Sequence, residues 1–439
     1  MISNLLVSLA LALDSLLAAS SVANTSSVGI MVYDLDIDSC LYERNARQTM
    51  RPASTQKLIT GITALNELGD CYHYTTSVSY TGRIDTSYVF CLEDSVYKLR
   101  RGSLQGNLYI TGVMDPKLNA GDLDILADEI YKMGIDTITG SLCGDATFMN
   151  DNKYGQGWCW DDDNPELCSL LFGRKEGLLQ NFAKALQKAG IVILGNVFEW
   201  ACPSSAQWLT SCNHSISEIL EKVMKNSNNT YAETLLYHLG ATQGKPSTAK
   251  KGIALEEALL KKIYAESPSQ LTHDRTSAPS HRFADGSGLS LYNYLSPEIE
   301  VAFLRYAFTH ENIYRHLREA LPIAGVDGTL EKRMKDTEAQ NNVRAKTGTL
   351  TGVISLAGYC TTKEGHNLAF SIIVNGCLNA DKTRNLQDKI CNILCNYEVR
   401  STMYDVRCVA TRVGSTMQEV TSTFKHQPRQ SRYIVIPNS

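Results

Sequence analysis

The sequence predicts a mixed α+β protein in which one α+β domain is inserted into another. Apolar, β-rich runs at residues 28–35 and 40–42 predict a hairpin that leads into a helix starting after Pro52. Another β-region opens at Val343, near the far end of the chain. Between these regions, residues 71–200 carry short Thr/Val/Tyr/Ile runs separated by Gly and Asp turns. We therefore expect an antiparallel sheet flanked by helices, which an inserted domain interrupts.

The chain divides into four segments on this pattern. Its 439 residues are too many for one ordinary hydrophobic core. Residues 1–70 and 201–398 would form the two parts of the main domain, and residues 71–200 the inserted domain. Residues 399–439 are polar and mildly basic without a clear period, so we expect a flexible or loosely docked tail.

The first residues predict an amphipathic helix. The apolar positions with helical spacing are Leu5, Leu9, Leu13 and Leu16. The first Lys or Arg is Arg44, so the basic region of a signal peptide is missing, and the apolar run is too short and interrupted to span a bilayer. We expect neither an export signal nor a transmembrane anchor in this sequence.

The net charge and the cysteine spacing indicate which partners and metal sites to expect. A formal net charge of −4 gives no basic footprint for nucleic acid, so no nucleic-acid partner is expected. None of the 13 cysteines forms C-x-x-C, and no Cys/His cluster has zinc spacing, so we expect no metal. The pairs Cys159/Cys168 and Cys202/Cys212 fit either short disulfide loops or small buried side chains, and spacing alone leaves both open.

A Ser-x-x-Lys motif follows Pro52 at the start of a predicted helix. Ser54 would lie in the first turn, and Lys57, three residues on, would share its face of the helix. Helix N-termini also offer unpaired N–H groups, so a hydroxyl placed there could act as a nucleophile. The motif is weak alone because it occurs three times, at Ser54/Lys57, Ser95/Lys98 and Ser247/Lys250.

Two further polar motifs follow. Ser227-Asn228-Asn229 lies between two predicted helices. A capping box of Ser215 and Glu218 predicts the start of the first helix, and Gly240 predicts the end of the second. Such a polar trio usually caps a helix, and Ser211-Cys212-Asn213 is a second copy. Lys346-Thr347-Gly348 occurs once, at the start of a predicted strand. Its glycine would allow a ligand or another backbone to approach closely.

A Ser/His/Asp triad is an alternative in the stretch Asp285-Gly286-Ser287-Gly288-Leu289-Ser290, with His281 nearby. The stretch lacks the G-x-S-x-G nucleophile pattern, and a Gly-flanked serine before a helix start is usually part of a turn. We therefore favour turn chemistry here.

The order S-x-x-K, S-x-N, K-T-G resembles the active-serine penicillin-recognising enzymes, namely penicillin-binding proteins and serine β-lactamases. Ser54 and Ser227 lie 173 positions apart. This spacing looks like the class C low-molecular-mass penicillin-binding proteins, D-alanyl-D-alanine carboxypeptidase/endopeptidases whose extra domain interrupts a transpeptidase fold between these motifs. Further similar stretches are Pro52–Thr55, Asp285–Ser290 and Gly106–Pro116.

The resemblance implies acyl transfer through an ester on Ser54. Lys57 would take the hydroxyl proton, Ser227 would relay a proton to the departing D-alanine nitrogen, and Asn229 would orient Lys57 and the substrate amide. Backbone N–H groups of Ser54 and Thr349 would form the oxyanion hole.

Substrate binding is implied in the same way. Lys346, Thr347, Gly348 and Thr349 would hold the terminal carboxylate of the peptide. Asp145 is a candidate for contact with the substrate side chain from the inserted domain, and a turn aspartate is an equally good interpretation.

The implied partners are peptidoglycan stem peptides and, as covalent inhibitors, β-lactam antibiotics, with no cofactor required. The implied location is the bacterial cell envelope, periplasmic or extracytoplasmic. The alternatives are a serine β-lactamase, for which we find no well-placed second general base, and a catalytically silent penicillin-fold binding module, against which the intact motifs argue.

Overall fold

The structure, a computed structural model, describes residues 8–89, 99–162, 164–266 and 277–398. These described residues form one compact unit. The predicted tail at 399–439 and the Ser95/Lys98 copy of the S-x-x-K motif lie outside the described residues.

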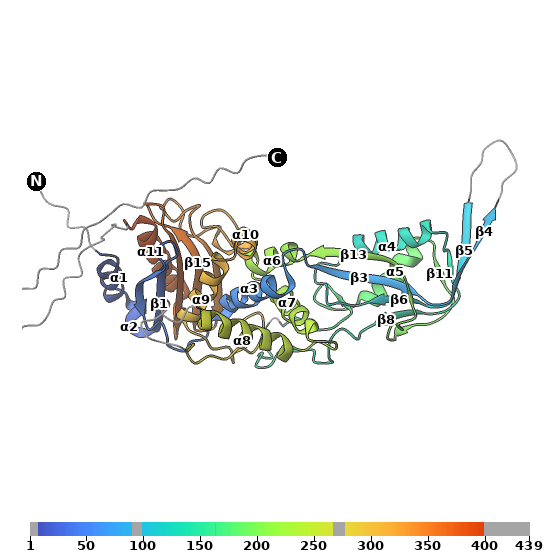
Figure 1. Cartoon of the computed structure of the whole chain (residues 1–439), viewed down its shortest axis with the longest axis horizontal. Helices are drawn as coiled ribbons and strands as arrows, with labels where there is room; N and C mark the ends of the chain where they lie inside the picture. Colours follow the sequence, from blue (N-terminus) through green and yellow to red (C-terminus); the bar gives the residue numbers. More distant parts are fainter. Residues whose placement is uncertain (1–7, 90–98, 163, 267–276, 399–439) are drawn as a thin grey trace, which may run out of the picture. The chain divides into compact units, whose positions relative to one another are not determined.

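A five-stranded antiparallel sheet joins the two ends of the described chain (Figure 1), with strand order β14–β15–β16–β1–β2. Its strands are β1 (Ser27–Asp34), β2 (Ser39–Arg44), β14 (Arg344–Leu350), β15 (Val353–Thr361) and β16 (Asn367–Asn375). The early hairpin therefore pairs with the late β-region, because β1 lies beside β16. The prediction of an antiparallel sheet flanked by helices is confirmed.

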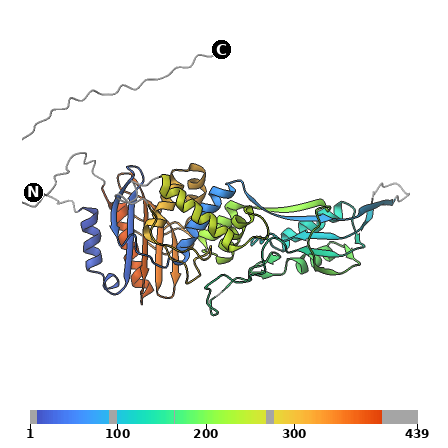
Figure 2. The same cartoon turned by 60° about the horizontal axis from the view of Figure 1, so that its bottom comes forward.

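Helices cover both faces of this sheet because apolar side chains alternate along its buried strands. Val28, Ile30 and Val32 of β1 pack with α1 (Leu9–Ala18) and α11 (Ala380–Asn396) on one face. Figure 2 shows α1, in dark blue, on the side of the sheet away from the green and yellow helices.

Met31 and Tyr33 of β1 point the other way, into the larger helical core. The helices of that core are α3 (Gln56–Leu68), α6 (Ile216–Lys225), α7 (Asn229–Thr242), α8 (Ala249–Glu266), α9 (Pro297–Phe308) and α10 (Glu311–Ala320).

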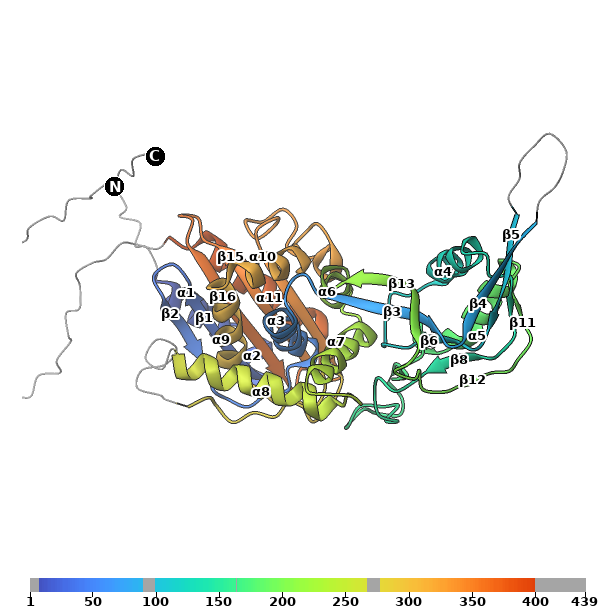
Figure 3. The same ribbon diagram turned by 45° about the vertical axis from the view of Figure 1, so that its right-hand side comes forward.

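Residues 73–215 build three further sheets, two larger ones that share a separate core and a two-stranded one made of β9 (Leu171–Phe172) and β10 (Lys175–Glu176). The five-stranded one has the order β12–β8–β6–β3–β13 and contains β12 (Val197–Glu199), β8 (Leu142–Asp145), β6 (Leu108–Thr111), β3 (His73–Tyr80) and β13 (Gln207–Ser215). In Figure 3, β3 and β13 run side by side from the helical core. β13 begins after the predicted limit at residue 200, and the division into domains stays a prediction.

The second of these sheets has the order β11–β7–β5–β4. It contains β11 (Val192–Ile193), β7 (Thr137–Ile138), β5 (Leu99–Gln105) and β4 (Arg83–Val89). Helices α4 (Ala120–Lys132) and α5 (Leu178–Lys188) supply much of the apolar surface of the core shared by the two sheets.

Local signals placed most helix ends correctly, with one clear error. The capping box of Ser215 and Glu218 is present at the start of α6. Gly240, however, does not end α7, which continues to Thr242. A Cβ at Gly240 would lie 2.5 Å from Ser247 Oγ, so this glycine allows close packing inside the helix.

The structure also bears on membrane-spanning helices and on disulfides. Within the described ranges, no helix is both long and apolar enough to cross a membrane. Cys159, Cys168, Cys202 and Cys212 are free thiols in the structure, so neither of the two disulfides considered from spacing is formed.

Candidate active site

Ser54 lies in a short 3₁₀ turn, Ala53–Thr55, that opens α3. Thr55 Oγ1 fixes this turn by donating to the carbonyl of Pro52 at 2.8 Å. Two glycines let other elements close around it: a Cβ at Gly288 would lie 1.8 Å from Ala53 O, and one at Gly348 would lie 2.9 Å from Ser54 N. The predicted helix start therefore packs against the loop that contains Gly288 and the strand that contains Gly348.

Lys57 is fully buried one turn after Ser54. Its Nζ atom lies 2.9 Å from Ser54 Oγ, 2.8 Å from Asn229 Oδ1 and 2.6 Å from the carbonyl oxygen of Ser287. An amide oxygen and a backbone carbonyl can only accept hydrogen bonds, whereas the serine hydroxyl can also donate one. A neutral lysine amine has two hydrogens and one lone pair, so this arrangement directs the lone pair at the Ser54 hydroxyl.

Burial favours that neutral form. Removal from water lowers the pKa of Lys57 to about 7, although the negative charges of Asp285 and Glu233 act in the opposite direction. The lysine is therefore close to the protonation balance that a general base needs near neutral pH.

The S-x-N motif supplies both a helix cap and two groups that reach the buried lysines. The cap is the middle residue, since Asn228 Oδ1 accepts from Tyr231 N–H at 3.2 Å at the start of α7. Ser227 has φ +55°, a left-handed conformation that is rare outside glycine. The two outer residues of the motif contact different lysines: Ser227 Oγ accepts a hydrogen bond from Lys346, and Asn229 Oδ1 accepts one from Lys57.

Lys346, the first residue of K-T-G, is also fully buried. Its Nζ donates to Ser227 Oγ at 2.8 Å and to the carbonyl of Thr347 at 2.7 Å. Burial, with the charge of Lys57 as the second cause, holds the pKa of Lys346 well below its usual range. Each buried lysine thus has a serine hydroxyl as a partner, and the charge of Lys57 disfavours the charged form of Lys346.

The rest of K-T-G lies along β14, at the edge of the main sheet. Gly348 brings this strand against the backbone N–H of Ser54. Thr347 Oγ1 donates to Thr329 Oγ1 at 2.8 Å, and Thr349 is exposed. Side chains that could hold a carboxylate therefore lie on the strand that packs against the half-buried Ser54.

Comparison with known proteins agrees with this arrangement. The profile of the D-Ala-D-Ala carboxypeptidase 3 (S13) family matches residues 9–168 and 172–397. The chain belongs to the S13 peptidase family. The resemblance to class C low-molecular-mass penicillin-binding proteins is confirmed, and so is the classification as a hydrolase.

Individual relatives cover most of this S13 chain. It is 26% identical to the D-alanyl-D-alanine carboxypeptidase DacB of Haemophilus influenzae, over 81% of this chain and 87% of the relative. It is 28% identical to the D-alanyl-D-alanine carboxypeptidase of Actinomadura sp., over 79% and 77%. The crystal structure of penicillin binding protein 4 (dacB) from H. influenzae matches with a TM-score of 0.74 at 23% identity, covering 88% of this chain and 99% of that one, which supports the shared fold.

Several groups of the S13 site escaped the sequence interpretation. The N–H of Ser287 donates to Glu233 Oε1 at 2.9 Å, and the carbonyl of the same residue accepts from Lys57. Glu233 is fully buried, and burial raises its pKa to about 8. A weak signal existed, because Glu233 follows Asn229 by four residues and so shares its face of α7.

Asp285 organises the loop that carries Ser287. Its carboxylate accepts from Gly288 N–H at 2.7 Å, from Ser290 N–H at 2.6 Å and from Trp158 Nε1 at 2.8 Å. Trp158 lies between β8 and β13 in the sequence. The segment between the S-x-x-K and S-x-N motifs therefore also helps to hold this loop in place.

The Ser/His/Asp alternative is wrong in the described geometry. Ser287 Oγ donates to Asp285 at 3.3 Å, but the ring of His281 binds Glu257 at 2.8 Å and the carbonyl of Pro279 at 2.8 Å instead. The stretch therefore acts as a turn that supplies a carbonyl to Lys57.

Asp145 ends β8, away from the hydrogen-bonded lysines. It is 6% exposed, and its Oδ1 accepts from the N–H of Thr147 at 2.9 Å, as in an aspartate turn. Its contact with a substrate side chain stays a prediction.

Proposed function

We propose that this chain is a serine D-alanyl-D-alanine carboxypeptidase/endopeptidase that forms an acyl-enzyme on Ser54. The observation that carries the proposal is the set of partners around Lys57 Nζ. Asn229 Oδ1 and Ser287 O, at 2.8 and 2.6 Å, account for both hydrogens of the neutral amine. The lone pair that remains faces Ser54 Oγ, 2.9 Å away.

In the first step, Ser54 Oγ would attack the carbonyl carbon of the penultimate D-alanine while its proton moves to Lys57 Nζ. The negative oxygen that develops would be held by the N–H groups of Ser54 and Thr349. Preorganised donors of this kind are worth much, since losing one typically costs about 100- to 1000-fold in rate.

In the second step, the peptide C–N bond would break and the leaving nitrogen would take a proton from Ser227. Ser227 Oγ accepts a hydrogen bond from the buried Lys346 amine at 2.8 Å, and it would regain its proton from Lys57, which thereby returns to the neutral form. Water would then hydrolyse the ester, with Lys57 again as the base, and free Ser54. No step calls for a cofactor.

Substrate recognition would rest on K-T-G. The terminal carboxylate carries one negative charge, and Lys346 with the hydroxyls of Thr347 and Thr349 offers donors along β14. Such a substrate is a peptidoglycan stem peptide, so the protein would work in the bacterial cell envelope, outside the cytoplasmic membrane. Asp145 is retained as the weaker candidate for binding the substrate side chain.

β-Lactam antibiotics would acylate the same serine. A crystal structure of the H. influenzae protein named above was determined in complex with a β-lactam. No described contact around Ser54 favours a β-lactamase or a silent binding module over the carboxypeptidase.

The test uses labelled penicillin and a short peptide ending in D-Ala-D-Ala. The full chain should take up one equivalent of label on Ser54, identified by mass mapping, and should release D-alanine from the peptide. Ser54→Ala should do neither, while near-UV circular dichroism should show a retained fold. An unlabelled wild type would refute the acyl-enzyme, and rapid release of hydrolysed penicillin without release of D-alanine would indicate a β-lactamase.

A further inference from the structure

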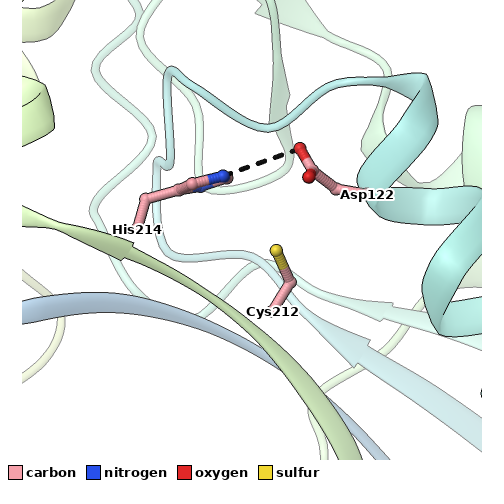
Figure 4. Close-up of side chains that lie close together, drawn as sticks. All are labelled: Asp122, Cys212 and His214. Atoms are coloured by element: carbon pink, nitrogen blue, oxygen red, sulfur yellow. Dashed lines mark ion pairs between the residues drawn. The ribbon is translucent and has the colours of Figure 1, made fainter.

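A second cluster of reactive side chains, outside the three sequence motifs, lies where β13 meets the first turn of α4 (Figure 4). Cys212 and His214 are two residues apart on β13, so they share a face of the strand. Asp122 reaches the same point from the N-terminal turn of α4. One donor atom from each of the three lies within 4.8 Å of the others.

The imidazole of His214 is oriented for a metal. Its Nδ1 lies 2.6 Å from Asp115 Oδ2, and the Asp115 side chain is only 1% exposed. Asp115 is itself fixed, because its other oxygen accepts from Lys117 N–H at 3.0 Å. The buried carboxylate therefore holds the proton on Nδ1 and leaves the lone pair on Nε2, which faces Asp122. A carboxylate behind the ligating histidine is the usual outer-shell arrangement of zinc sites.

The distances suit a small divalent ion. His214 Nε2 and Asp122 Oδ2 are 3.7 Å apart. Bond lengths of about 2.0 Å to nitrogen or oxygen and about 2.3 Å to sulfur place tetrahedral ligands roughly 3.3–3.6 Å apart. In Figure 4 the sulfur of Cys212 points at the space between the other two side chains, so modest side-chain movement would complete the spacing.

We propose that Asp122, Cys212 and His214 bind one Zn²⁺ ion, with water as the fourth ligand. The thiolate, imidazole and carboxylate donors are those that zinc uses in proteins, and the thiolate disfavours calcium and magnesium. Sequence spacing pointed to no metal because the ligands come from two elements about 90 positions apart, which no short motif records.

The other His/carboxylate group in the described part of the chain is a poorer candidate. It consists of Asp34, Asp36 and His366 and has no sulfur ligand. Asp34 Oδ1 accepts from the N–H groups of Asp36 and Ile37, at 3.0 and 3.2 Å, and so closes a turn. Asp122 Oδ2 likewise accepts from the backbone N–H and the side-chain amide of Asn119, at 2.9 and 2.6 Å, so the missing sulfur is what separates the two groups. This group serves the hairpin between β1 and β2, and it gives an internal contrast for the test.

The proposed ion would link α4 to β13, and β13 leads through α6 to the S-x-N motif. β13 ends at Ser215, where α6 begins, and α6 ends two residues before Ser227. A ligand bound only by the folded state stabilises that state, so zinc should raise the melting temperature of the whole chain. Its role would be structural, since none of its ligands contacts the Ser54 cluster.

The test strips the full chain of metal with a chelator and titrates it with Zn²⁺, and separately with Co²⁺ as a spectroscopic probe. Wild type should bind one equivalent and give a thiolate-to-cobalt charge-transfer band. Cys212→Ser should lose that band, and Asp115→Asn should bind about 10- to 100-fold more weakly, as expected for loss of an outer-shell carboxylate. The matched control is Cys202→Ser, another partly buried thiol outside the cluster, which should behave as wild type.

Two results would overturn the proposal. One is a wild type without the thiolate band, which would leave His214 and Asp115 as an ion pair only. The other is equal metal affinity in wild type and Cys212→Ser, which would place binding at other cysteines. Penicillin acylation of every variant checks that each has folded, because acylation depends on Ser54 and not on these ligands.

Discussion

Two copies of the same short motif end in very different surroundings. Ser54–Lys57 and Ser247–Lys250 both lie at the start of a helix, α3 and α8. Lys57 is fully buried and contacts Ser54 and groups from two other segments, whereas Lys250 is exposed. Ser247 Oγ donates to the carbonyl of Tyr237, so that hydroxyl is engaged in packing α7 against the start of α8.

The difference shows that the chemistry does not reside in the four-residue pattern. Helix geometry can place a lysine amine beside a serine hydroxyl three residues earlier, as it does at Ser54 and Lys57. Only at Ser54 do a helix connection, a loop and a sheet edge remove water from the lysine, which lowers its pKa to about 7. The segments that bury Lys57 are therefore what allows its amine to act as a base near neutral pH.

The largest expected effect comes from removing each lysine in turn. Lys57→Ala should slow penicillin acylation by about 100- to 10,000-fold, the usual contribution of a positioned general base. Lys250→Ala should leave the acylation rate unchanged, because its side chain is exposed and away from Ser54. Stopped-flow or gel-based labelling measures both rates, and circular dichroism checks the folds. Fast acylation in Lys57→Ala would mean that another group takes the proton.

The sequence could predict the groups whose identity is written in local patterns. Ser54, Lys57, Asn229 and Lys346 each belong to a short motif, and the order of the motifs separated them from chance copies. The sheet that brings the motifs together followed from β-rich runs at both ends of the chain.

It could not predict the supports of the site. Ser287 contributes only its backbone carbonyl to Lys57, and any residue could do so. Glu233 and Asp285 matter through burial and charge, which depend on three segments meeting in space. Gly240 was misjudged for the same reason, since its packing against Ser247 and the start of α8 is a tertiary property that overrides the helix-stop signal.

The next effect depends on pH. Below a pH of about 7, Lys57 gains a proton and its lone pair is lost, so the acylation rate should fall as the pH falls. The fall should approach about tenfold per pH unit well below this value and level off above it. Acylation rates measured between acidic and alkaline pH, at constant ionic strength, locate the midpoint. A rate that does not change across that range would show that Lys57 is not the titrating base.

The smallest expected effect tests whether the enclosure can be loosened without touching the reacting groups. Glu233→Ala would leave the N–H of Ser287 without its acceptor, at a cost of about 1–3 kcal/mol. Because the carbonyl of Ser287 orients Lys57, we expect up to about 1.4 kcal/mol of this cost to enter the acylation barrier, which slows acylation by up to about tenfold. Glu233→Gln keeps an acceptor oxygen in place and should stay closer to wild type.

The charge of Glu233 decides how closely the acylation rate of Glu233→Gln matches that of wild type. Burial raises the pKa of Glu233 to about 8, so at pH 7 the carboxyl is mostly neutral and glutamine alters the charge little. Above pH 8 the wild-type carboxylate would favour protonated Lys57, but Lys57 is already mostly neutral at that pH, so the glutamine variant should still acylate at close to the wild-type rate. Equal loss of rate in both variants at every pH would mean that Glu233 supports the fold alone and does not act on Lys57.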